Sequence, residues 1–211
     1  MRRRDRPGAL FCLSLEQMLK NLCMAGGFSL FWGFIFCIFL YIIHLYSVRS
    51  LPNPEVAVMT RTNAREIAVH FIFELGFSNE SAQSLLEEFL TPEAFARLGE
   101  EEPLYAQFPN DKQRAYIEEL VSGVYQHAAE LDSYIERYAQ GWRFARIDRV
   151  AVAIMRSSMY EILYMPDIPN SASINEAVEI AKGYETPETC SFINGILGTF
   201  VREELPEVPE K

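Results

Sequence analysis

The chain has 211 residues, of which 49% are hydrophobic and 23% are charged, a composition that supports roughly one globular domain. Six of its 19 Lys and Arg residues and three of its 29 Asp and Glu residues precede Met59, so residues 59–211 carry a net charge of −13. Because affinity for phosphate comes largely from cationic contacts, this acidity argues against a general nucleic-acid binder. It favours a basic protein partner or an RNA contact confined to a local patch, and a solvated surface without a partner is the alternative.

The first 58 residues contain an apolar segment. Residues 28–46, FSLFWGFIFCIFLYIIHLY, meet the length criterion for a membrane-spanning helix, and Pro52 and Pro54 then interrupt any helix. The positive charges before the segment would export the rest of the chain, which has a single cysteine, Cys190, and therefore no disulfide framework suited to export. We expect residues 1–58 to be an extension from a misassigned translation start, with Met59 as the start of a cytoplasmic protein. A genuine membrane anchor at residues 28–46 is the alternative.

After this extension, every apolar run has helical spacing. Such runs cover residues 67–75, 85–90, 117–124, 131–138 and 147–162, with Gly and Pro between them and no alternating β pattern. Residues 59–205 are therefore predicted to form an all-α bundle of six or seven helices. Residues 99–110 are predicted to be a loop, and residues 206–211 a flexible tail.

Two capping signals mark the last helices. Ser173 followed by Glu176 has the spacing of a capping box, which predicts that a helix begins there. Thr186 followed by Pro187 combines a preferred N-cap residue with a proline at the first helical position.

Two groups of arginines are candidate binding residues. Arg61 and Arg65 are four residues apart at the start of the first helix, so both project from one face and could hold phosphate. On spacing alone, pairing with neighbouring glutamates is the favoured interpretation. The second group follows Trp142 and consists of Arg143, Arg146, Arg149 and Arg156. For this second group, salt bridges to acidic helices and a core tryptophan are the favoured interpretation.

Catalytic and metal-binding patterns are not found. The three histidines are isolated, without metal-ligand spacing, and there is no glycine-rich phosphate loop. Cys190 is most simply a helix residue. We predict neither an enzyme nor a bound metal or cofactor.

Several short motifs together resemble the NusB family, in the same order along residues 60 to about 201. They are Ala64-Arg65-Glu66, Leu131-Asp132 with Ile135, Trp142-Arg143, Ile154-Met155-Arg156 with Tyr160-Glu161, Asp167-Ile168-Pro169, residues 174–182 (INEAVEIAK) and Phe192-Ile193-Asn194-Gly195.

This resemblance implies two packed helical subdomains and a non-catalytic adaptor. Family members act in transcription antitermination: with NusE they bind boxA elements of nascent ribosomal RNA and so act indirectly on elongating RNA polymerase. Carried over by motif, the RNA face would be Arg61, Arg65 and His70, and the partner face Tyr184, Glu188 and Phe192. The alternative function is a membrane-tethered helical scaffold without RNA binding, and a homodimer is left open.

Overall fold

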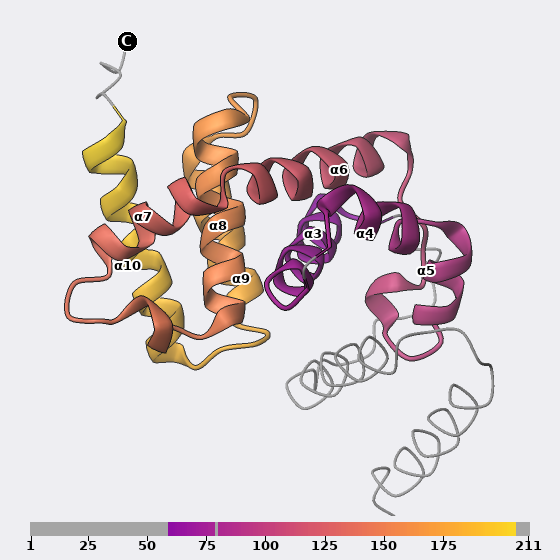
Figure 1. The fold of residues 1–211 in the computed structure, drawn as a ribbon, viewed down its shortest axis with the longest axis horizontal. Coiled ribbons are helices and arrows are strands. Elements are labelled where there is room, and N and C mark those ends of the chain that lie inside the picture. Colours follow the sequence, from indigo (N-terminus) through magenta and orange to yellow (C-terminus); the bar gives the residue numbers. More distant parts are fainter. Residues whose placement is uncertain (1–58, 79, 206–211) are drawn as a thin grey trace, which may run out of the picture. The chain divides into compact units, whose positions relative to one another are not determined.

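The computed structural model describes residues 59–78 and 80–205, and all of its regular structure there is helical (Figure 1). The first α-helices are α3 (Arg61–Leu75), α4 (Ala82–Phe89), α5 (Pro92–Leu98) and α6 (Asp111–Gln126). They are followed by α7 (Ala128–Tyr138), α8 (Arg149–Tyr164), α9 (Asn170–Ala181) and α10 (Pro187–Glu204). Two short 3₁₀ helices are η1 (Pro103–Tyr105) and η2 (Phe144–Arg146). The prediction of an all-α fold is confirmed.

The described residues form eight α-helices, where six or seven were predicted. The helix that periodicity missed is α5, which Thr91 caps and which begins at Pro92. It is too short to show an apolar repeat of its own. Residues 99–110 were predicted to be a loop, but they include η1 and place Tyr105 in the core.

Helix contacts fall into two groups that meet at α8. Helices α3, α4 and α6 pack on one another, with α5 and η1 against α4 and α3. Helices α7 to α10 form the second group, and α3 and α6 both contact α8 (Figure 1). Gly123 shows how closely α6 approaches α8, because a Cβ atom there would lie 2.0 Å from the Tyr160 ring. Any larger residue at this position would require the Tyr160 ring to move.

Helix starts follow local chemistry in most places. The Thr186 side chain accepts a hydrogen bond from the Thr189 N–H at the start of α10, as the Thr186-Pro187 signal predicted. The predicted capping box at Ser173 is wrong, since α9 already begins at Asn170. Ser173 lies inside α9 and its hydroxyl bonds elsewhere.

Among the described helices, none combines the length and apolar character needed to cross a membrane. The sequence predicted an apolar segment at residues 28–46, a translation start at Met59 and a tail at residues 206–211. Residues 1–58 and 206–211 lie outside the residues that the structure describes.

Candidate functional site

The two arginines at the start of α3 occupy different environments. Thr60 caps the helix, its hydroxyl oxygen accepting the Asn63 N–H at 3.0 Å, and Arg61 follows as an exposed residue of the first turn. One turn later, Arg65 is only 6% exposed. The hypothesis that both arginines project from one face to hold phosphate is therefore wrong for Arg65, because α8 and α9 pack against this turn of α3. For Arg65 the other interpretation, pairing with glutamates, is confirmed.

The partner of Arg65 is a fully buried carboxylate. Arg65 Nε donates to Glu161 Oε1 at 2.7 Å, and Glu161 in α8 has an exposure of 0%. The Tyr116 hydroxyl donates to the same oxygen, while Ser173 Oγ donates to Glu161 Oε2 at 2.6 Å. These bonds join α3, α6, α8 and α9 around one charge. They also explain why Ser173, inside its helix, is not a cap.

Glu176 extends this network toward the surface. Arg65 Nη1 donates to Glu176 Oε2 at 3.2 Å, and Thr62 Oγ1 donates to the same oxygen at 2.7 Å. Burial acts to lower the pKa of Arg65, but the surrounding Tyr116, Glu161 and Glu176 oxygens outweigh it and raise the pKa above its usual value. Arg65 is thus held as a cation by protein groups.

His70 lies in a second buried network. It is 3% exposed, its Nδ1 lies 2.8 Å from the Tyr105 hydroxyl, and its Nε2 lies 2.7 Å from the Tyr184 hydroxyl. The Tyr184 hydroxyl donates its only proton to Glu66 Oε1 at 2.7 Å, so His70 Nε2–H donates to Tyr184 and Nδ1 accepts from Tyr105. Burial lowers the pKa of His70 to about 3, so the ring is neutral at physiological pH. It offers no charge to a phosphate.

The three residues of the expected partner face differ in exposure. Tyr184 directs its hydroxyl toward α3 in the network just described. Glu188 is exposed in the first turn of α10, where the helix dipole favours a carboxylate. Phe192, one turn further, is half-buried, and its ring centroid lies 5.2 Å from that of Trp142. Of the three residues, only Glu188 is both charged and exposed to solvent.

Two arginines of the group after Trp142 are engaged within the fold, one of them in a predicted ion pair. Arg156 makes a bidentate pair with Asp132, at 2.7 and 2.8 Å. Arg149 donates to the Gly76 carbonyl at 3.0 Å and stacks over Phe77 at 4.6 Å. These two arginines link α8 to α7 and to the end of α3, so their role is structural.

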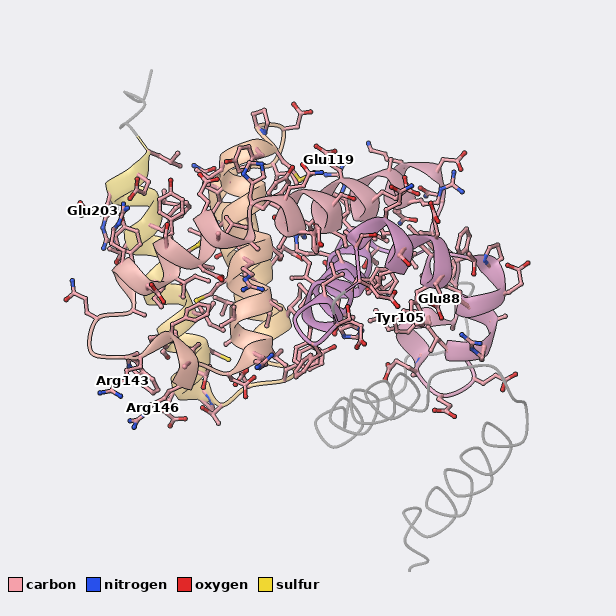
Figure 2. The ribbon with its side chains drawn as sticks, viewed as in Figure 1. Glu88, Tyr105, Glu119, Arg143, Arg146 and Glu203 are labelled. Carbon is pink, nitrogen blue, oxygen red and sulfur yellow. The ribbon has the colours of Figure 1, made fainter. Side chains whose placement is uncertain are left out.

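The rest of that group is different. Trp142, expected in the core, is 58% exposed. Arg143 and Arg146 are exposed too, and Figure 2 shows both side chains extending away from the ribbon at η2. The sequence interpretation grouped Trp142 with Leu131 and Ile135 as structural. Gly141, a helix breaker directly before Trp142, was the sign that the tryptophan lies outside that helix.

Within residues 59–78 and 80–205, no group of three or more His, Cys, Asp or Glu side chains could hold a metal ion. Cys190 is a buried free thiol whose pKa is raised by burial.

Comparison with known proteins decides the family. The family model described as NusB family matches residues 62–202. The chain belongs to the NusB family. It is 41% identical over 146 residues to the transcription antitermination protein NusB of Thermoanaerobacter sp. (strain X514), covering 69% of this chain and 93% of that protein. Identity to the NusB of Carboxydothermus hydrogenoformans is 39% over 153 residues, covering 72% and 99% of the two chains.

Solved NusB structures share the fold. The T. maritima NusB structure superposes with a TM-score of 0.59 at 27% identity, over 71% of this chain and 96% of that one. A structure of the antitermination factors NusB and NusE in complex with double-stranded RNA gives a TM-score of 0.55 at 20% identity, over 67% and 96%. That second likeness concerns the fold alone.

Three of the motifs that resemble the NusB family contribute residues to one buried network. Arg65 comes from the Ala-Arg-Glu motif, Glu161 from the Tyr-Glu motif, and Glu176 from the INEA motif, and all three meet in one network. The motifs that identify the family in this chain therefore include the residues that hold α3, α8 and α9 together.

Proposed function

We propose that this protein is a transcription antitermination factor, a non-catalytic RNA-binding adaptor. With NusE it binds boxA-like elements of nascent ribosomal RNA transcripts and supports processive elongation by RNA polymerase, which it contacts indirectly. The observation that carries this proposal is the identity of 41% to a transcription antitermination protein NusB across 93% of that protein's length. The complex of NusB and NusE with double-stranded RNA, seen with the same fold, agrees with these two ligands.

The functional unit in this proposal is residues 59–205, with two packed helical subdomains, and residues 206–211 are a tail. The grouping of helix contacts about α8 supports this division, and the family match falls within it. In this proposal the protein acts in the cytoplasm, because nascent RNA is made there. Residues 28–46 are not needed for the RNA-binding role.

Within the RNA face, Arg61 is the residue that we expect to contact phosphate directly. It is exposed at the first turn of α3, and no ion pair of its guanidinium is recorded within the described part of the chain. Arg65 and His70 belong to the same helix but lie inside, where they fix the position of α3 against α8 and η1. They support the RNA face by holding the helix that carries Arg61.

The partner face is centred on Glu188. An exposed carboxylate in the first turn of α10 suits a basic protein, and residues 59–211 are strongly acidic, which favours association with a cationic partner. Phe192 supplies apolar area one turn later, and Tyr184 fixes the preceding turn to α3. This arrangement fits a basic surface on NusE.

Binding measurements test the proposal. The protein is titrated with a short single-stranded RNA carrying a boxA element, alone and with NusE, beside an RNA of scrambled sequence. We expect boxA RNA to bind more tightly than the scrambled RNA, and more tightly again when NusE is present. Equal affinity for the two RNAs, with and without NusE, would contradict the proposed function.

A further inference from the structure

An exposed aromatic pair lies at the junction between α7 and η2. Trp142 is 58% exposed and its ring centroid lies 5.2 Å from that of Phe192 in α10, with the ring planes 47° apart. Gly141, which precedes Trp142, has φ of +81°, a left-handed backbone that glycine adopts without strain. This turn carries the indole out of the core and sets it beside α10.

The nearest cations along the chain are free. Within residues 59–78 and 80–205, no ion pair or side-chain hydrogen bond is recorded for Arg143 or Arg146, while Arg149 and Arg156 are both engaged. These two guanidinium groups lie next to the exposed indole, in a domain whose net charge over residues 59–211 is −13. We call Trp142, Phe192, Arg143 and Arg146 the tryptophan surface.

We propose that the tryptophan surface binds a single-stranded segment of RNA, with one unpaired base stacked on Trp142 and neighbouring phosphates held by Arg143 and Arg146. This inference rests on the proposed function and adds a contact that α3 alone does not supply. Bases stack on exposed aromatic side chains irrespective of sequence, and arginines beside the ring neutralise the backbone. Phe192 holds the indole in place.

The chemistry favours RNA over an acidic peptide. Carboxylates would bind the two guanidinium groups equally well, but they would make no use of a flat indole face that is more than half exposed. A nucleic-acid strand uses both, since its bases and phosphates alternate along the chain. Because the stacked base has to be unpaired, the ligand is single-stranded.

Fluorescence tests the stacking contact directly. The chain has two tryptophans, so a full-length Trp32→Phe protein leaves Trp142 as its only indole. Titrated with short single-stranded boxA RNA in the presence of NusE, it should show quenched Trp142 emission. Trp142→Ala should weaken RNA binding by roughly tenfold or more, and Trp142→Phe should restore most of the affinity because it keeps a ring.

The arginines are tested through salt dependence. Arg143→Ala and Arg146→Ala should each weaken RNA binding and each lower the slope of log K against log salt by about 0.7. Arg97→Ala is the matched control: Arg97 is exposed in α5, which packs on α4 and η1, and its loss removes the same charge elsewhere. It should leave both quantities nearly unchanged.

The outcomes separate this inference from the proposed function. If the unaltered protein binds boxA RNA while Trp142→Ala and the two arginine variants bind equally well, the inference is overturned and the proposed function stands. Quenching by poly-glutamate but not by RNA would overturn it in favour of an acidic peptide. A protein that binds no RNA even with NusE would overturn both.

Discussion

Removing Arg65 should destabilise the fold far more than removing its neighbour Arg61. Arg65→Met keeps the apolar stem but deletes the guanidinium group that lies 2.7 Å from Glu161 and 3.2 Å from Glu176. Glu161 is fully buried, so its charge would be left with only the Tyr116 and Ser173 hydroxyl groups as partners. Breaking a buried pair by removing one partner costs about 3–5 kcal/mol, because the remaining charge is not compensated.

The free energy of unfolding can be measured by urea denaturation followed by helical circular dichroism. Arg61→Met is the matched control, since it makes the same chemical change one turn earlier at an exposed position, where such changes have little effect. Arg65→Lys should lie between the two, because an ammonium group cannot reproduce the paired contacts of a guanidinium.

A double variant distinguishes the loss of the ion pair from the loss of side-chain packing as the cause of a lower free energy of unfolding. Glu161→Gln combined with Arg65→Met removes the uncompensated charge, so the double variant should be more stable than the sum of the single changes. A loss below about 1 kcal/mol in Arg65→Met, similar to Arg61→Met, would refute the argument that the pair is buried and essential.

Four further outcomes are expected. Deleting residues 1–58 should leave a helical domain with a cooperative thermal melt; a broad melt would show that the extension belongs to the fold. Arg61→Ala should weaken boxA RNA binding and flatten its salt slope by roughly one contact while the melt stays unchanged. Glu188→Lys should abolish NusE binding, measured by calorimetry, with little loss of stability. Burial and the nearby Asp148 raise the pKa of Glu185 from 4.5 to about 7, so the folded state binds the extra proton and loses stability as pH rises between these values. Glu185→Gln should therefore stabilise the protein above pH 7 by about 1 kcal/mol, allowing for its partial exposure, and have little effect below pH 4.5.

Local sequence rules predicted helix content better than helix ends. The Thr186-Pro187 signal located the start of α10 because both residues act within one turn of chain. The Ser173 signal failed because the hydroxyl of that serine bonds to Glu161, which precedes it by 12 residues in a different helix. A capping motif is local, so it does not predict a hydrogen bond to a residue that folding brings close from another helix.

Spacing alone did not predict the burial of Arg65 for the same reason, although pairing with glutamates was one of the two interpretations. Spacing places Arg61 and Arg65 on one side of α3, but the second of them is covered by helices whose contacting residues lie 96 and 111 positions away. One sign was present in the sequence. Glu161 lies within an apolar helical run, and a carboxylate in such a run needs a cation, which the long-range pair with Arg65 provides.

The difference between buried and exposed residues also limits how far a family motif can locate a binding site. Arg65, Glu161 and Glu176 belong to motifs of the resemblance, and together they stabilise the helix junction from inside. Trp142 and Arg143 belong to another of its motifs, yet they reach solvent. Since both motifs belong to the same resemblance, burial is what separates residues that hold α3 in place from residues that can touch RNA. Mutations in the first set should lower stability before affinity, and mutations in the second should lower affinity alone.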